Sequence, residues 1–199
     1  MKKLSTKPLR LILASKSETR KKILKDYNLK FSSIKHNIDE EKIKKDYPYL
    51  SKRSLALYLA KRKALSLRRK KEEIIIGSDQ ILVLGNNICN KAKNFEEAKK
   101  NLLLLQNNKH TLISAIYIVR GNEFLWCCVR EAIIKMKQLM EHEITNYLKN
   151  NKSIYLNTVG AYKIENDVLQ CLTVIKGDDE TIKGFPIKNF IPYLKRAKR

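Results

Sequence analysis

The chain has 199 residues, of which 42 are lysine or arginine and 20 are aspartate or glutamate, so its formal net charge at pH 7 is +22. This length can bury a substantial core as one domain or as two packed lobes. No stretch approaches the roughly 20 apolar residues of a membrane span, and the apolar run 9–14 is too short for a signal peptide. We therefore expect a cytoplasmic protein with no membrane partner.

The positive charge by itself favours a polyanionic partner. Lysines, however, occur in nearly every predicted helix, which indicates a compositional background rather than one selected patch. A broad positive field still favours anionic substrates and speeds their encounter with the protein. Nucleic-acid binding therefore stays open as an alternative, although the chain has no RNP-like aromatic motif.

Hydrophobic periodicity predicts a mixed α/β protein, with strands and helices alternating early and a hairpin in the middle of the chain. The predicted strands span 9–14, 31–36, 74–84, 111–119, 124–135 and 168–175. The predicted helices span 17–27, 51–70, 95–105, 140–149 and 187–196. Turn signals at 85–87 and 120–122 separate neighbouring strands, so we expect a mixed rather than a purely parallel sheet.

The first polar segment after a predicted strand contains Ser15, Ser17 and Arg20. Hydroxyls, the N–H groups of a helix N-terminus and a guanidinium can together bind a phosphate. Ser15 and Glu18 also fit an S-x-x-E capping box, which is the simpler interpretation. The chain has neither a P-loop nor a G-x-G-x-x-G fingerprint, so those nucleotide-binding folds are not indicated.

Asp79 follows three isoleucines and precedes another apolar run, 81–84. A carboxylate in such surroundings is costly unless it is paired, hydrogen-bonded or bound to a metal. Asp79 is therefore either a metal ligand or general base, or a hydrogen-bonded structural residue. The pair Asp39-Glu40 is weaker evidence, because such pairs commonly lie in solvated turns.

Other candidates carry less information when taken singly. Cations that could assist phosphate chemistry are Lys63, Lys91 and Lys163, but lysine is too frequent here for spacing to select one. The pair Gly160-Ala161 permits close backbone approach to a ligand, or simply forms a tight turn. The cysteines and histidines show no metal-ligand spacing, which predicts free thiols and no zinc site; they are Cys89, Cys127, Cys128, Cys171, His36, His110 and His142.

Five motifs in order resemble the Maf family of nucleotide pyrophosphatases, and the resemblance spans nearly the whole chain. They are the L-I-L-A-S-x-S-x-x-R of 11–20, the D-E of 39–40, the A-x-x-K-A of 60–64, the G-S-D-Q of 77–80 and the G-x-P of 184–186. The resemblance implies a single Maf-like domain over 1–199. Its implied fold is Maf/ITPase-like, a mixed, curved central sheet flanked by helices, with the site in a cleft between two lobes.

The implied activity is hydrolysis of a nucleoside triphosphate between the α and β phosphates, giving a monophosphate and pyrophosphate. Asp79 would accept the proton of the attacking water and, with Glu40, hold a divalent cation, Mg²⁺ or Mn²⁺. The implied phosphate-binding residues are Ser15, Ser17, Arg20, Lys63 and Lys91. A homodimer is also implied by the resemblance.

Three variable positions, Thr19, Gln80 and Glu165, resemble the subgroup that acts on 7-methyl-GTP. Together with Lys163 they are the base-reading candidates that the resemblance implies. A carboxylate could accept hydrogen bonds from guanine, and a glutamine offers both donor and acceptor. The chain departs from the family with Glu18 in place of proline, and with Asn90 and Ala92 on either side of Lys91. The rival hypothesis is a basic RNA-binding or ribosome-associated protein without catalysis, whose affinity would fall steeply with salt.

Overall fold

The computed structural model describes residues 10–68, 70–166 and 170–196 and divides the chain into two compact units. Unit 1 comprises Met1–Asp79, Ser114–Val129 and Gly184–Arg199. Unit 2 comprises Gln80–Ile113 and Arg130–Lys183. Each unit is described by itself below. The prediction of a single domain over 1–199 stays a prediction.

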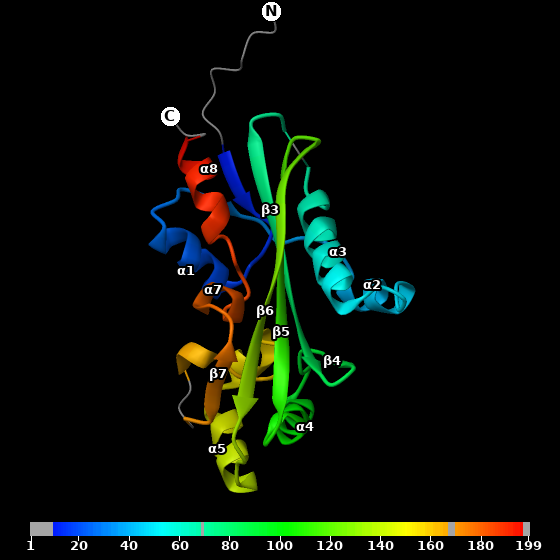
Figure 1. Cartoon of the computed structure of the whole chain (residues 1–199), viewed down its shortest axis with the longest axis vertical. Coiled ribbons are helices and arrows are strands. Elements are labelled where there is room, and N and C mark those ends of the chain that lie inside the picture. Colours follow the sequence, from blue (N-terminus) through cyan, green and yellow to red (C-terminus); the bar gives the residue numbers. More distant parts are fainter. Residues whose placement is uncertain (1–9, 69, 167–169, 197–199) are drawn as a thin grey trace, which may run out of the picture. The chain divides into compact units, whose positions relative to one another are not determined.

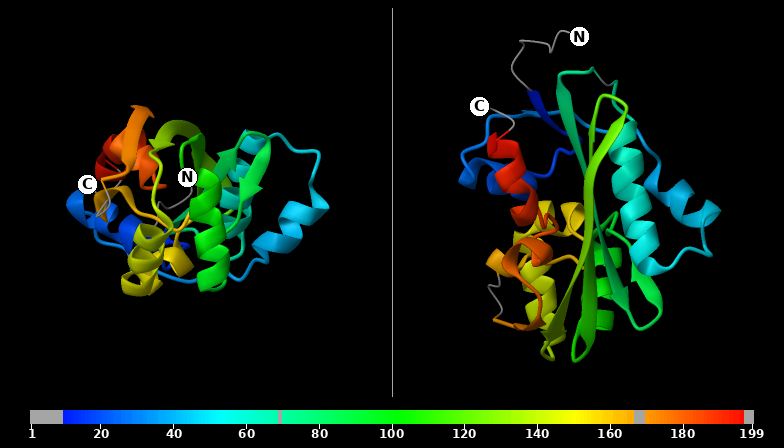
Figure 2. Two further views of the ribbon diagram at one scale, coloured as in Figure 1. Left: turned by 90° about the horizontal axis from the view of Figure 1, so that it is seen from below. Right: turned by 45° about the horizontal axis from the view of Figure 1, so that its top comes forward.

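The elements form one mixed α/β arrangement, with a seven-stranded sheet and flanking helices (Figures 1 and 2). The strands are β1 (Arg10–Leu13), β2 (Ser32–Ser33), β3 (Glu73–Leu84), β4 (Asn87–Cys89), β5 (Lys109–Arg120), β6 (Glu123–Met136) and β7 (Leu172–Lys176). The α-helices are α1 (Glu18–Asp26), α2 (Glu40–Asp46), α3 (Lys52–Leu65), α4 (Phe95–Leu105), α5 (Glu141–Asn150), α6 (Lys152–Asn157), α7 (Asp179–Ile182) and α8 (Ile191–Arg196). Short 3₁₀ turns are η1 (Ile164–Asn166) and η2 (Lys188–Phe190).

Strand directions confirm the predicted mixed sheet. The strand order is β2-β1-β3-β5-β6-β7, with β4 paired to β3. Strand β1 is parallel to both β2 and β3, whereas β4 is antiparallel to β3 and β7 is antiparallel to β6. Strands β3, β5 and β6 each contribute residues to both units.

Side-chain alternation along the strands of unit 1 builds two apolar layers, as the two-residue period of a strand requires. Figure 1 shows α1 and α8 on one side of β1 and β3, and α3 on the other. The layer that includes residues of α1 and α8 contains Leu11, Leu13, Ile74, Ile76, Ile116, Ile118, Leu24 and Leu194. The layer that includes α3 contains Ile12, Ala14, Ile75, Val119 and Ala64.

Gly77 explains why α3 lies so close to β3. A Cβ at this position would lie 2.1 Å from the Ala60 carbonyl oxygen and 2.6 Å from the Ala64 nitrogen. Such contacts are sterically forbidden, so only glycine permits this approach of helix to strand. Because alternate residues of a strand share a face, Asp79 points to the α3 side with Gly77, and Ser78 points to the other side.

Unit 2 packs α4, α5 and α6 together around its own core. This core includes Leu82, Leu102, Leu105, Ile134, Met136, Ile144 and Leu148. Gly160 has a φ of +81°, and a Cβ there would lie 2.6 Å from Leu82 Cδ1. Ala161 follows with a φ of +62°. Gly160 therefore suits a tight turn over this core, as the simpler of the two interpretations of the sequence expects.

Most predicted elements are confirmed, and several boundaries are corrected. Helix 95–105 matches α4, and strand 74–84 matches β3 within one residue. The predicted strand 31–36 is reduced to the two residues of β2, and the helix predicted to reach residue 70 ends at Leu65. Three parts of the predicted elements lie outside the described residues. They are residue 9 of the first predicted strand, residue 69 of the helix predicted over 51–70, and residues 168–169 of the last predicted strand. Helices α2, α6 and α7 and strand β4 were not predicted.

Within the described ranges, no helix is both long enough and apolar enough to span a bilayer. None of the four cysteines forms a disulfide, in agreement with the sequence prediction. No group of three or more His, Cys, Asp or Glu side chains that could hold a metal is found among the described residues.

Candidate active site

The predicted phosphate-binding segment follows the carboxyl end of β1 and enters α1. Ser17, not Ser15, is the N-cap of α1, because its side chain accepts from the Arg20 backbone N–H. The predicted capping box of Ser15 and Glu18 is thus wrong. Ser15 is 5% exposed, and its Oγ instead accepts from the Ser17 N–H at 3.2 Å. Both hydroxyls therefore organise this turn in the structure.

The Arg20 guanidinium is fixed by three acceptors. It donates to the Gly184 carbonyl at 3.2 Å, to the Ser78 carbonyl at 2.9 Å and to Ser15 Oγ at 3.3 Å. The planar guanidinium suits such fixed, multiple contacts. Burial lowers the pKa of Arg20, whereas the negative charges of Asp79 and Glu40 raise it. Arg20 thus interacts electrostatically with both predicted metal ligands, Asp79 and Glu40.

Asp79, Lys63 and Glu40 form an ion cluster on the α3 side of β3. Lys63 Nζ lies 2.5 Å from Asp79 Oδ1 and 2.9 Å from Glu40 Oε1. Lys63 and Asp79 are each 3% exposed, whereas the Glu40 side chain is 28% exposed. A buried carboxylate requires such a partner. The structure is compatible with both interpretations of Asp79 drawn from the sequence. The residue is ion-paired, as a structural role requires, and it lies beside a second carboxylate, as a metal site requires.

Local structure explains why these three side chains converge. Gly77 lets α3 lie against β3, which brings Lys63 to Asp79. Asp39 caps α2 by accepting from the Lys42 N–H at 2.9 Å, so Glu40 begins the helix. The pair Asp39-Glu40 is therefore not a solvated turn. One carboxylate caps the helix, and the other reaches Lys63.

His36 is the site residue that the sequence did not indicate. Its Nε2 lies 3.5 Å from Glu40 Oε1, and its Nδ1 is buried without a hydrogen-bond partner among the described residues. Burial, reinforced by the charge of Lys63, lowers the pKa of His36 from 6.5 to about 4. The imidazole is therefore neutral at pH 7. A lone histidine with no ligand spacing gave no signal that could have identified it.

The late G-x-P motif supplies one backbone acceptor, the Gly184 carbonyl, to the same region. The Gly184 carbonyl accepts from Arg20 and also from Ser78 Oγ, the latter at 3.1 Å. Gly184 has a φ of +81°, a conformation that favours glycine. Residues far apart in the sequence thus share one hydrogen-bonded network in unit 1.

The remaining sequence candidates are distributed over both units. Thr19 is half-buried on α1 in unit 1. Gln80, Lys91, Lys163 and Glu165 belong to unit 2. The Gln80 amide nitrogen donates to the Thr181 and Ile182 carbonyls at 3.2 and 2.9 Å. Lys91 is exposed and forms an isolated β-bridge with Val159, which places it beside the Gly160-Ala161 turn.

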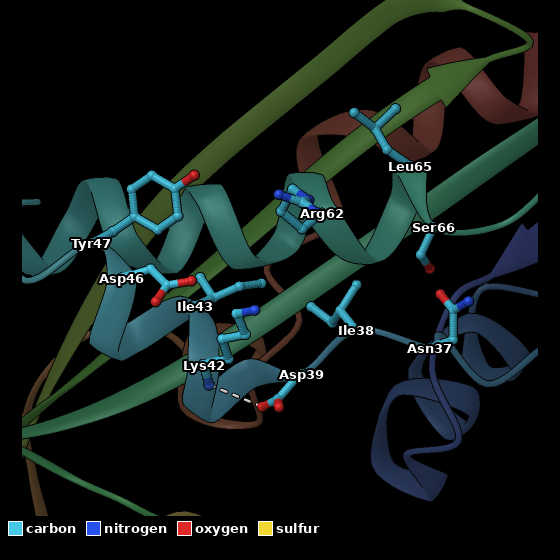
Figure 3. Close-up of a pocket in the computed structure, with 10 residues that line it drawn as sticks. All are labelled: Asn37, Ile38, Asp39, Lys42, Ile43, Asp46, Tyr47, Arg62, Leu65 and Ser66. Atoms are coloured by element: carbon cyan, nitrogen blue, oxygen red, sulfur yellow. Dashed lines mark hydrogen bonds between the residues drawn. The ribbon is translucent and has the colours of Figure 1, made fainter.

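A surface pocket of about 400 Å³ lies between α2 and α3 and does not contain the ion cluster (Figure 3). Its lining residues are Asn37, Ile38, Asp39, Lys42, Ile43, Asp46, Tyr47, Arg62, Leu65 and Ser66. The Asp39 carboxylate in its wall is used to cap α2. The pocket therefore borders the helix that carries Glu40 without presenting the candidate catalytic groups.

The cluster suits a divalent cation that also binds phosphate. Mg²⁺ is commonly held by one or two carboxylates together with substrate phosphate oxygens and water. Glu40 and Asp79 provide two carboxylates whose oxygens converge on a single cationic atom, Lys63 Nζ. The donor set therefore fits this metal class.

This fold and site define a mixed α/β protein with a cation-and-carboxylate cluster suited to a phosphorylated ligand. The chain belongs to the Maf family, because the model of that family, described as Maf-like protein, matches residues 10–197. The nucleoside triphosphate pyrophosphatase of Pelagibacter ubique is 35% identical over 94% of this chain and 98% of its own length. The 7-methyl-GTP pyrophosphatase of Brucella abortus is 33% identical over 96% and 97%, respectively.

A solved structure titled "Structure of a HAM1 protein from Coxiella burnetii" covers 94% of this chain and 99% of its own, with a TM-score of 0.46 and 13% identity. This similarity is too weak to support any inference about the site. The family assignment rests instead on the match over residues 10–197 and on the relatives that align over nearly their full length.

Proposed function

We propose that the protein is a nucleoside triphosphate pyrophosphatase, which cleaves the bond between the α and β phosphates to give a monophosphate and pyrophosphate. The observation that carries this proposal is the Asp79–Lys63–Glu40 cluster in a chain of the Maf family. Relatives aligned over nearly their full length bear the names nucleoside triphosphate pyrophosphatase and 7-methyl-GTP pyrophosphatase. The rival RNA-binding hypothesis rests only on the overall positive charge of the chain.

Asp79 is the proton acceptor in this reaction. We assign the proton from the attacking water to the Asp79 carboxylate, which lies beside Lys63 and Glu40. As that proton leaves, the water oxygen forms a bond to phosphorus, and the bridging P–O bond breaks toward pyrophosphate. A positioned carboxylate typically contributes 10²–10⁴-fold as a general base.

Cationic groups bind the phosphate chain and stabilise the leaving pyrophosphate. Arg20 is preorganised by backbone acceptors, so it need not reorient during the reaction. Lys63 is the cation next to the proton acceptor, Asp79. Ser15 and Ser17 shape the turn that leads from β1 into α1. Lys91 is the phosphate contact proposed from unit 2.

Glu40 and Asp79 would hold a divalent cation, Mg²⁺ or Mn²⁺. When bound, it would neutralise charge on the phosphates and orient them. The remaining chemistry uses the chain's own side chains, as described above.

Base selection is assigned to Thr19, Gln80, Lys163 and Glu165, with 7-methyl-GTP or another non-standard nucleotide as the substrate. Glu165 is exposed on η1, where its carboxylate can accept hydrogen bonds from a guanine edge. The Gln80 amide nitrogen donates to two carbonyls of α7, which fixes the position of this candidate. A homodimer and a cytoplasmic location belong to the same proposal.

The test is product analysis by chromatography, using a panel of ordinary and modified triphosphates with Mg²⁺ or Mn²⁺. We expect a monophosphate plus pyrophosphate, and a loss of at least about 100-fold in kcat for Asp79→Asn. Asp46→Asn, an exposed change on α2, is the matched control and should keep the wild-type rate. Orthophosphate as the only product, or a rate insensitive to Asp79→Asn, would exclude the proposed reaction.

A further inference from the structure

We propose that Lys63 and the divalent cation are alternative occupants of the space between Glu40 and Asp79, so that the cation binds tightly only after a triphosphate has drawn Lys63 away. This inference rests on the proposed function and concerns the order in which its ligands bind. It starts from one contact pattern: Lys63 Nζ touches both carboxylates that the cation would need, at 2.5 and 2.9 Å.

The formal charge of the nucleotide-free cluster supports exclusion of the cation. Two carboxylates, Glu40 and Asp79, face two cationic side chains, Lys63 and Arg20, so the cluster is neutral as it stands. Adding a dication would leave an uncompensated double positive charge next to Lys63 and Asp79, which are almost fully buried. Burying net charge in this way is unfavourable unless counter-charge arrives with it. A triphosphate brings that counter-charge.

The contacts also show which of the two cations can move. Arg20 is held by two backbone carbonyls and one serine hydroxyl, and none of these is a ligand that the metal requires. The Lys63 ammonium is held by Asp79 and Glu40 themselves. An ammonium has three N–H donors on a flexible stem, so it can exchange carboxylate for phosphate without a change in the backbone.

The consequence is a site that stays closed to free metal and opens for the metal–nucleotide complex. The Lys63 ammonium would bind phosphate oxygens in place of the two carboxylates. Other phosphate oxygens would provide ligands for the cation. The Glu40 and Asp79 carboxylates, once released by Lys63, would be available to hold the cation, and Asp79 would be free of its contact with Lys63 when it is needed as a base. Lys63 thereby couples metal binding to substrate binding.

The test measures Mn²⁺ binding by water proton relaxation on nucleotide-free protein, a readout that needs no turnover. We expect weak binding to the wild type and, for Lys63→Met, an affinity higher by roughly tenfold or more, because the two carboxylates lose their resident cation. Lys63→Arg keeps the charge and should bind Mn²⁺ as weakly as the wild type. Lys61→Met, an exposed change on the same helix, is the control for net charge and should also match the wild type.

A second measurement covers the case in which Lys63→Met does not fold, as judged by circular dichroism. The wild type is titrated with Mn²⁺ in the presence and absence of an α,β-methylene triphosphate, which cannot be cleaved at the proposed bond. We expect at least about tenfold tighter Mn²⁺ binding with the analogue. Equal affinities in this titration, or equal affinities of wild type and Lys63→Met, would overturn the exchange. Product analysis tests the reaction separately, so either proposal can fail alone.

Discussion

Units 1 and 2 hold their candidate residues in different ways. In unit 1 the candidates contact one another: Lys63 joins Asp79 to Glu40, and Arg20 lies in the field of both carboxylates. In unit 2 the candidates are exposed, as Lys91 and Glu165 are, or are bound to backbone carbonyls, as Gln80 is. Mutual contact suits groups that carry out a reaction in a fixed geometry. Exposure suits residues that select among ligands, so we assign proton transfer to unit 1 and, apart from Thr19, the choice of nucleotide to unit 2.

The largest expected effect comes from separating α3 from β3 in unit 1. In Gly77→Ala the new methyl would meet the Ala60 carbonyl oxygen and the Ala64 nitrogen, so α3 must shift and carry Lys63 away from Asp79. We expect a loss of about 3 kcal/mol in the free energy of unfolding, the upper end for overpacking. Urea unfolding measures this loss.

Gly85→Ala is the matched control for Gly77→Ala. Gly85 has a φ of +56°, and a Cβ added there would have no neighbouring atom within 4 Å, so alanine meets backbone strain but no clash. That change should cost about 1 kcal/mol. If both variants lose the same stability, the close packing of α3 on β3 does not determine the geometry of the cluster.

The next effect comes from the fixed guanidinium. In Arg20→Lys an ammonium replaces the group that reaches the Gly184 and Ser78 carbonyls, and a single point charge cannot reproduce that geometry. We expect kcat/KM to fall about tenfold or more and the free energy of unfolding to fall by about 1–3 kcal/mol. Steady-state kinetics and urea unfolding measure the two effects.

Arg62→Lys provides the comparison for Arg20→Lys. Arg62 is exposed on α3, where it donates to the Tyr58 hydroxyl at 3.1 Å. Its conservative replacement should change stability by less than about 0.5 kcal/mol and leave kcat/KM unaltered. An Arg20→Lys variant that behaves like Arg62→Lys would show that positive charge alone is enough at position 20.

A third prediction concerns pH, and it applies to His36 in unit 1 and to His110 in unit 2. Burial lowers the pKa of His36 and of His110 to about 4, from 6.5. The unfolded chain therefore takes up these protons below about pH 6.5, whereas the folded chain does so only near pH 4. Stability is fully present above pH 6.5 and falls as the pH drops toward 4, by about 1.4 kcal/mol per pH unit for each histidine.

Urea unfolding at pH 4.5, 5.5 and 6.5 measures this slope. His36→Gln and His110→Gln should each flatten it, while His142→Gln, at an exposed position, is the control. An unchanged slope in both His36→Gln and His110→Gln would show that other groups cause the loss of stability in acid.

The sequence predicted the strands of the site better than its contacts. The isoleucine run before Asp79 and the turn signals around it are enough to predict β3, because strand periodicity is a local property. Helix α2 escaped prediction because its seven residues bury only Ile43, so no periodicity is visible. Lys63 could be selected among 42 basic residues only through the A-x-x-K-A motif, since spacing cannot reveal a contact made across the fold. His36 had neither periodicity nor motif, and its role depends wholly on tertiary packing.

The smallest expected effect tests nucleotide choice in unit 2. Glu165→Gln removes one charge at an exposed position and should leave the free energy of unfolding within about 0.5 kcal/mol of the wild type. Because a neutral amide accepts hydrogen bonds from a guanine edge less strongly than a carboxylate, we expect the preference for 7-methyl-GTP over a pyrimidine triphosphate to fall by about three- to tenfold. The ratio of kcat/KM values measures that preference, and Glu96→Gln on α4 is the exposed control in the same unit. A uniform loss of rate on every triphosphate would instead place Glu165 with the residues of the reaction, and the division of roles between the two units would then be wrong.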